Sequence, residues 1–126
     1  MHILIVDDDE QLPRALQRAL KDAGYTADRG HRISCAGDGN ACRRIVAEDG
    51  PVDVMFMDGD LGIGDTGPQV VSMLREAGCT ATIIMTSGSA EMCQAGIEAG
   101  ANGSCNKPIL GVDPTKVLIT FGIPPP

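Results

Sequence analysis

The sequence has few aromatic residues: among its 126 residues there is no tryptophan, one tyrosine and two phenylalanines. That scarcity argues against a protein that binds nucleic acids by stacking bases on aromatic rings. Basic residues are also few, since 10 lysines and arginines stand against 17 acidic residues and leave a net charge of -7. A domain that binds DNA or RNA on its own usually carries the opposite charge. We therefore expect no direct nucleic-acid partner.

Long apolar segments are missing as well. No run reaches the length of a membrane span, and the first residues lack the pattern of a secretory signal peptide. The five cysteines stand at irregular spacings without a Cys-x-x-Cys pair, which argues against a disulfide framework and against a zinc site. We interpret them as small buried apolar residues in a reducing compartment. These observations predict a soluble, cytoplasmic protein with no membrane partner.

The chain is long enough for one domain with a hydrophobic core. Apolar residues make up 43% of it, more than a disordered chain would carry. We expect the domain to cover residues 1–121. Residues 122–126 are expected to form a proline-rich tail, because three consecutive prolines can continue neither a helix nor a strand.

Strand and helix patterns alternate along the chain. His2–Val6 (HILIV) is a continuous apolar run, which is typical of a parallel strand buried on both faces. The first helix is expected to be capped by Asp9 and to end at Gly24. Further strands are expected at Arg32–Ala36, Val52–Met57, Ala81–Thr86 and, more weakly, Gly103–Asn106. Helices are expected at Glu10–Ala23, Asn40–Glu48, Pro68–Ala77 and Ser89–Ala99, whereas Val117–Phe121 fits either element.

This alternation predicts an α/β fold in which right-handed crossovers build a doubly wound, five-stranded parallel sheet. In such sheets the functional crevice lies at the carboxyl ends of the strands. The residues that follow the predicted strands are Asp7, Asp8 and Asp9 after the first, Asp58 and Asp60 after the third, Ser87 and Gly88 after the fourth, and Lys107 after the fifth.

Carboxylates gathered at one edge of a sheet are costly. Two unit charges 4 Å apart repel by ~4 kcal/mol at an effective dielectric constant of 20. A hard cation offsets that repulsion, and Mg²⁺ takes carboxylate, carbonyl and water oxygens as ligands. A carboxylate beside it can attack a phosphoryl group, whose oxygens Lys107 and Ser87 would stabilise. Each of these residues alone more often caps a helix or forms a turn, so the prediction rests on their order and common placement.

The set resembles the receiver domain of two-component response regulators, the CheY-like superfamily. Four stretches carry the resemblance: Ile3–Glu10 (ILIVDDDE), Val52–Asp58 (VDVMFMD), Ile83–Gly88 (IIMTSG) and Ala95–Pro108 (AGIEAGANGSCNKP). It implies a flavodoxin-like fold with strand order 2-1-3-4-5. It also implies a phosphorelay, in which a sensor histidine kinase or phosphotransfer protein phosphorylates the domain. The surface of the fourth helix, fifth strand and last helix would then change for a downstream target protein.

The resemblance also implies a role for each residue at the strand ends. Asp58 is the phosphoacceptor, and Ser87, with Thr86 as the alternative, is the switch hydroxyl. Lys107 binds the phosphoryl group, and its peptide bond to Pro108 is cis. The magnesium ion is held by Asp7, Asp8 and Asp58 and by the backbone carbonyl of Asp60. Such a domain is no enzyme toward other substrates, since it only phosphorylates and dephosphorylates itself.

The chain departs from the family pattern at several positions. Ser104 stands three residues before the lysine, where the family usually has an aromatic residue, and Gly62 stands where proline is common. The link Tyr25–Arg32 and the loop Asp58–Gly67 are longer than usual. Two alternatives stay open. One is a pseudo-receiver, a protein-interaction module that signals without phosphorylation, and the other is a phosphatase of the haloacid-dehalogenase type, suggested by the Asp-x-Asp pattern after the third strand.

Overall fold

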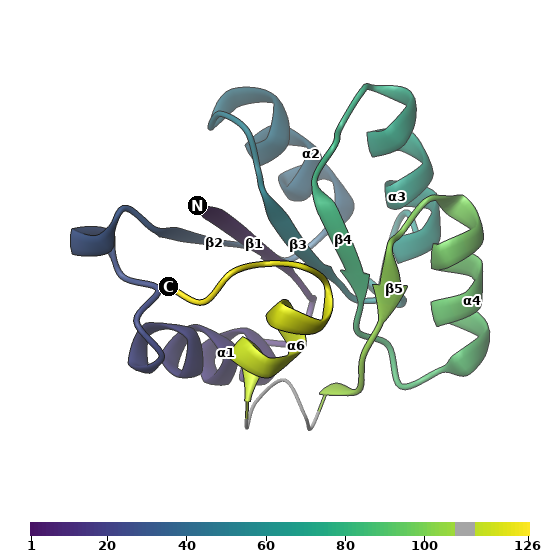
Figure 1. The fold of residues 1–126 in the computed structure, drawn as a ribbon. Coiled ribbons are helices and arrows are strands. Elements are labelled where there is room, and N and C mark those ends of the chain that lie inside the picture. Colours follow the sequence, from purple (N-terminus) through teal and green to yellow (C-terminus); the bar gives the residue numbers. More distant parts are fainter. Residues whose placement is uncertain (108–112) are drawn as a thin grey trace.

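A computed structural model describes residues 1–107 and 113–126 of the chain (Figure 1). Its centre is a five-stranded parallel sheet in the order β2-β1-β3-β4-β5, which confirms the predicted α/β fold and strand order. The strands are β1 (His2–Val6), β2 (Arg32–Ala36), β3 (Val54–Met57), β4 (Thr82–Met85) and β5 (Gly103–Ser104). All five residues of β1 are buried, as expected of a central strand covered on both faces.

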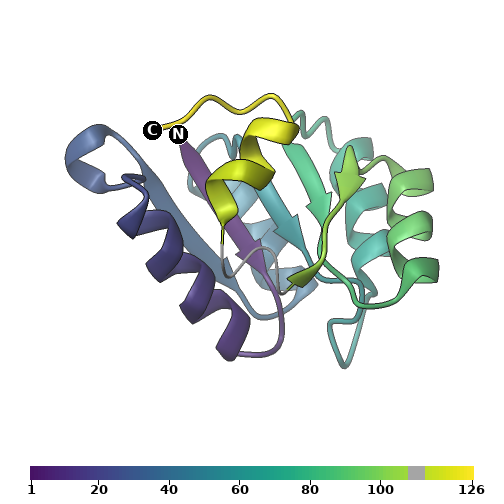
Figure 2. The same cartoon turned by 60° about the horizontal axis from the view of Figure 1, so that its bottom comes forward.

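Helices cover both faces of the sheet. The helices are α1 (Gln11–Asp22), α2 (Gly39–Glu48), α3 (Gly67–Glu76), α4 (Ala90–Ala99) and α6 (Pro114–Thr120), with a short 3-10 helix η1 (Ala27–Arg29) in the long link after α1. Figure 2 shows α1 and α6 together on one face, while α2, α3 and α4 cover the other. The segment Val117–Phe121, which fits either element by sequence, belongs to helix α6 as far as Thr120, with Phe121 as the C-cap. Asp113 caps the start of α6 by accepting a hydrogen bond from the N–H of Lys116.

Two apolar clusters hold these layers together. Under α1 and α6, Leu16 and Leu20 pack with Ile3 and Ile5 of β1. The second cluster lies under α2, α3 and α4 and includes Val70. These five side chains are 0–1% exposed, and full burial of each contributes about 1.5–3 kcal/mol. The strands whose ends carry the site residues are therefore packed on both faces.

Several predicted boundaries were wrong by one or two residues. Asp9 is not the N-cap of α1: its carboxylate accepts the N–H of Gln11, and the helix begins one residue later than expected, after Glu10. β3 begins at Val54 rather than Val52. The backbone of Asp53 still bonds to both neighbouring strands, but its carboxylate, and not a backbone carbonyl, accepts the N–H of His2 at 2.7 Å. Strands β4 and β5 are also shorter than predicted.

The structure describes all five cysteines, and all are free. Cys42 is buried as predicted, but the prediction was wrong for Cys35, which is exposed beside α1 and accepts a hydrogen bond from Gln17. Cys79, Cys93 and Cys105 are partly buried.

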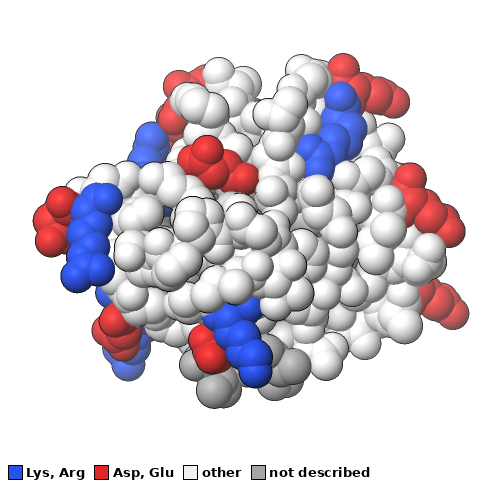
Figure 3. Space-filling model, in the orientation of Figure 1, with Lys and Arg blue, Asp and Glu red and all other residues white. Residues whose placement is uncertain are grey.

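The carboxyl end of the chain lies against the domain. Ile123 packs on the cluster under α6, and the Tyr25 hydroxyl donates to the carbonyl of Pro124 at 3.3 Å. Figure 3 shows uncharged residues over the centre of the face that α6 and this segment form, with basic and acidic side chains around its rim. None of the helices in residues 1–107 and 113–126 is long and apolar enough to cross a membrane.

Candidate functional site

The site begins where two central strands end side by side. Val6 and Met57 are partners in the register of β1 and β3, so the residues after them, Asp7 and Asp58, leave the sheet at the same level. Backbone hydrogen bonds fix both, since Asp7 N–H donates to Ala36 and Asp58 N–H donates to Val6. The strand-end placement expected from the sequence is thus built by the sheet itself.

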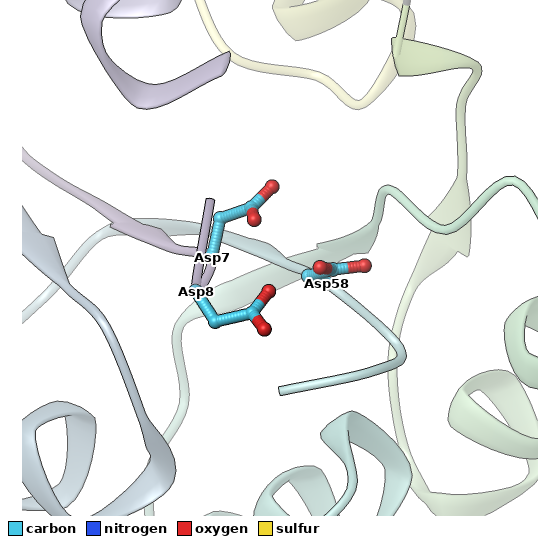
Figure 4. Close-up of side chains that lie close together, drawn as sticks. All are labelled: Asp7, Asp8 and Asp58. Carbon is cyan, nitrogen blue, oxygen red and sulfur yellow. The ribbon is translucent and has the colours of Figure 1, made fainter. Parts of the chain in front are cut away.

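Three carboxylates meet at this edge. Asp7, Asp8 and Asp58 each offer one oxygen, and the three oxygens lie within 4.8 Å of one another. Figure 4 shows the three carboxyl groups projecting from the adjacent strand ends into a common space. The Asp7 and Asp58 side chains are 1% and 7% exposed, whereas Asp8 is exposed. Two of the three carboxylates are therefore almost without solvent.

Lys107 is the cation of this cluster. Its Nζ lies 3.2 Å from Asp58 Oδ1 and 3.3 Å from Asp7 Oδ2, so it bridges the two buried carboxylates. The Lys107–Pro108 peptide bond lies outside the described residues, and its predicted cis geometry stays a prediction. Asp7 also accepts the N–H of Asp9 at 2.9 Å. One ammonium thus balances three neighbouring carboxylates only in part.

The imbalance appears in the protonation of Asp58. Burial raises the pKa of Asp58 above its ordinary value, the Asp7 carboxylate raises it further, and Lys107 opposes the rise without cancelling it. Burial lowers the pKa of Lys107, but the carboxylates of Asp58 and Asp7 raise it by more, so Lys107 stays charged. Ionisation of Asp58 therefore lowers the stability of the folded protein.

The remaining predicted residues lie around the same opening. Ser87 follows β4 and lines the pocket, and its Oγ accepts the N–H of Ser89 at 3.1 Å. The alternative hydroxyl, Thr86, is 1% exposed and lies outside the pocket lining. Asp60 lines the pocket from the loop after β3, and its carboxylate accepts the N–H of Gly62. The structure thus brings together every site residue that the sequence predicted, in an open pocket of about 480 Å³.

The loop from β3 to α3 is pinned close to Asp58 by features that the sequence prediction missed. Gly67 N–H donates to the carbonyl of Gly59 at 2.9 Å, and a β-carbon on Gly67 would collide with the backbone carbonyl of Asp58. Thr66 and Gln69 form a capping box at the start of α3. The Thr-x-x-Gln spacing could have revealed the capping box, but the close approach of Gly67 carries no sequence signal.

The backbone conformation explains why glycine stands at position 62, where the family pattern commonly has proline. Its φ of 74° lies in the left-handed region, which proline cannot adopt. A β-carbon there would lie 3.1 Å from Asp8 Oδ2, so the loop passes close to the carboxylate cluster. The next residue, Ile63, is 99% exposed. The longer loop therefore approaches Asp8 at Gly62 and carries one fully exposed apolar side chain, that of Ile63.

The donor set fits a magnesium ion. Mg²⁺ prefers oxygen ligands, and in proteins it often binds through one or two carboxylates while it keeps several waters. Asp7, Asp8 and Asp58 supply carboxylate oxygens at the mouth of an open pocket. A cation would also complete the charge balance that Lys107 leaves incomplete.

The comparison with protein families gives this site its context. The profile of the response regulator receiver domain matches residues 3–118, so the chain belongs to the response regulator receiver domain family. Receiver domains are generally signalling modules that bind Mg²⁺ and interact with histidine kinases and downstream effectors.

Individual relatives agree with this assignment. The photosynthetic apparatus regulatory protein RegA of Rhodovulum sulfidophilum is 34% identical over 128 residues, which covers 98% of this chain. The chain spans 66% of the length of that relative. Among solved structures, Vibrio cholerae CheY4 has a TM-score of 0.75 at 26% identity and covers 96% of this chain and 95% of its own. A CheY-like receiver domain of Methanospirillum hungatei shares the fold with a TM-score of 0.76 at 22% identity, over 96% of this chain and 90% of that one.

Proposed function

We propose that this receiver domain accepts a phosphoryl group on Asp58 as a step of a two-component phosphorelay. The observation that carries the proposal is the setting of Asp58. Its carboxylate is almost buried, lies 3.2 Å from Lys107 Nζ and shares a cluster with Asp7 and Asp8. The phosphodonor is the phosphohistidine of a sensor histidine kinase or phosphotransfer protein. We place the relay in the cytoplasm, and we take the domain as residues 1–121 with a proline-rich tail over 122–126.

The transfer is a displacement at phosphorus. An oxygen of Asp58 forms a bond to phosphorus while the bond from phosphorus to the imidazole nitrogen breaks, and the imidazole leaves with the electron pair. Lys107, already in contact with Asp58, compensates the charge of the phosphoryl oxygens, and Ser87 donates a hydrogen bond to one of them. The products are an acyl phosphate on Asp58 and a free histidine on the donor.

Asp7, Asp8 and Asp58 would hold the magnesium ion, together with the backbone carbonyl of Asp60. When bound, the ion supplies positive charge to the phosphoryl oxygens. Asp8 is the exposed member of the cluster, and it supplies a carboxylate on the solvent side. Buried Asp7 holds Lys107 in place at 3.3 Å.

Phosphorylation then favours a changed α4–β5–α6 surface, which a downstream target protein recognises. Ser87 links the pocket to that surface, because its carbonyl accepts from Cys93 of α4 at 3.4 Å. Ser104 of β5 is exposed and has too small a side chain to fill the space an aromatic residue would occupy. The movement therefore depends on Ser87 and the segment after it.

Incubation with acetyl phosphate and Mg²⁺ tests the proposal. The intact mass of the protein is expected to rise by one phosphoryl group, and Asp58→Asn is expected to remove that adduct. Asp60→Asn is the matched control, because only the backbone carbonyl of Asp60 enters the proposal. An unmodified wild-type protein would instead support the pseudo-receiver reading, and turnover of external phosphate esters would support a phosphatase.

A further inference from the structure

The residue after the phosphoacceptor is a buried glycine with helix α4 directly against it. A β-carbon on Gly59 would lie 2.7 Å from Cβ of Met92 and 2.9 Å from Cβ of Ser87. Side chains in proteins do not pack so closely. Both neighbouring atoms are Cβ atoms, which cannot move unless the backbone moves with them. The absence of a side chain at position 59 therefore lets the first turn of α4 approach the loop after Asp58.

Met92 occupies the place that this glycine leaves. Its position is fixed by the start of α4, where Ser89 Oγ accepts the Met92 N–H at 3.3 Å. The half-buried Met92 side chain lines the same pocket as Asp58 and Lys107. Among the described residues that line this pocket, the others are carboxylates, hydroxyls, one ammonium and one glycine. Among the described residues, Met92 is thus the one apolar side chain that lines this polar pocket.

We propose that Met92 shields Asp58 from water and thereby sets the lifetime of the phosphorylated domain, an inference that rests on the proposed function. In the reaction that ends the phosphorylated state, the oxygen of a water molecule bonds to phosphorus while the bond to the Asp58 oxygen breaks. The Asp58 carboxylate leaves with the electron pair, and the products are the free carboxylate and dihydrogen phosphate.

The chemistry of the thioether explains why Met92 slows this step. Sulfur in methionine is a weak acceptor and offers no hydrogen to donate, so it cannot hold and orient an attacking water as a carboxylate, amide or hydroxyl can. Its unbranched side chain also fills irregular space well. A smaller or more polar side chain at position 92 would admit water next to Asp58.

The first test needs neither phosphate nor metal. Metal-free protein is treated with a water-soluble carbodiimide and glycine ethyl ester, and amide formation at Asp58 is followed by peptide mass mapping. Met92→Ala is expected to raise the labelling rate at Asp58 about threefold, equivalent to a barrier lowered by about 0.65 kcal/mol. Met73→Ala is the matched control, because Met73 is a half-buried methionine of α3 outside the pocket lining. Equal labelling rates in Met92→Ala and wild type would overturn the inference even if no phosphorylation occurred.

The second test measures the lifetime. Protein phosphorylated with acetyl phosphate and Mg²⁺ is freed of donor, and loss of the adduct is timed by intact mass. Met92→Ala is expected to lose it about threefold faster or more, Met92→Leu is expected to restore the slow loss, and Met73→Ala should match wild type. If circular dichroism shows Met92→Ala unfolded, Met92→Gln takes its place with the same expectation. A lifetime unchanged or longer in the folded variant would overturn the inference, whereas a wild type without adduct would refute the proposed function.

Discussion

Replacement of Asp58 by asparagine is expected to stabilise the metal-free protein, although it removes the ion pair between Asp58 and Lys107. The carboxylate of Asp58 lies almost without solvent in a cluster with two others. Asparagine has nearly the same shape and can still accept a hydrogen bond from Lys107, which keeps its ion pair with Asp7 at 3.3 Å. The substitution therefore removes repulsion and leaves the packing intact.

The geometry sets the size of the gain. Carboxylate oxygens within 4.8 Å repel by at least about 3.5 kcal/mol per pair at an effective dielectric constant near 20. Attraction between Lys107 Nζ and Asp58 at 3.2 Å amounts to about 5 kcal/mol on the same scale. The loss of solvation on burial adds to the repulsion from Asp7, and the raised pKa of Asp58 shows that together they exceed this attraction. In a domain of this size each 1 kcal/mol of that excess raises the melting temperature of Asp58→Asn by about 3–5 °C.

The gain depends on pH in a defined direction. The pKa of Asp58 in the folded protein is raised by burial and by Asp7, so the folded state binds this proton more tightly than the unfolded state. The resulting stability is fully present below the ordinary aspartate pKa of about 3.9. It is lost as the pH rises through the raised folded pKa. Wild type is thus penalised at neutral pH, and the advantage of Asp58→Asn shrinks on acidification.

Urea unfolding in EDTA, at neutral and at mildly acidic pH, measures this effect. Asp22→Asn is the matched control, because it removes the same charge from an exposed position on α1. We expect Asp58→Asn to unfold at higher urea than wild type at neutral pH, and Asp22→Asn to remain close to wild type. The reasoning fails if Asp58→Asn is no more stable than the Asp22→Asn control.

Three further results are expected from the same site. Asp8→Ala should abolish the stabilisation that Mg²⁺ gives wild type in thermal melts; an unchanged magnesium dependence would remove Asp8 from the metal site. Ser87→Ala should still accept a phosphoryl group but lose most of the amide shifts of α4 measured by NMR, whereas Ser104→Ala should be nearly silent; a full response in Ser87→Ala would reverse these roles. Gly67→Ala should cost about 1–3 kcal/mol of stability in urea unfolding, because its β-carbon meets the carbonyl of Asp58, and a neutral effect would contradict that contact.

The sequence was sufficient for the fold and for the polar residues of the site because both follow from local pattern and topology. A continuous apolar run such as His2–Val6 belongs in a buried parallel strand, and parallel strands end at one edge. The sequence alone therefore places Asp7 and Asp58 together. Lys107 followed from the same rule, although it lies 100 residues from Asp7 in the sequence.

What the sequence could not show depends on how elements pack. The contact between Gly59 and Met92 exists only once α4 lies against the end of β3, and Gly59 alone looks like any loop glycine. The start of α1 was misplaced because Asp9 accepts the N–H of Gln11 from outside the helix, and the N-cap residue, Glu10, makes no side-chain capping bond. The helical state of Val117–Phe121 is decided by the Asp113 cap and by packing on the sheet, against the β-branched character of the segment.

Chemical trapping of the phosphorylated residue tests the central claim most directly. Protein incubated with acetyl phosphate and Mg²⁺ is reduced with borohydride, which converts an aspartyl phosphate into homoserine, and the modified residue is located by peptide mass mapping. The account predicts homoserine at position 58 and at no other acid of the cluster. Homoserine at position 7, 8 or 60, or an unmodified position 58 in protein that carries the phosphoryl adduct, would contradict it.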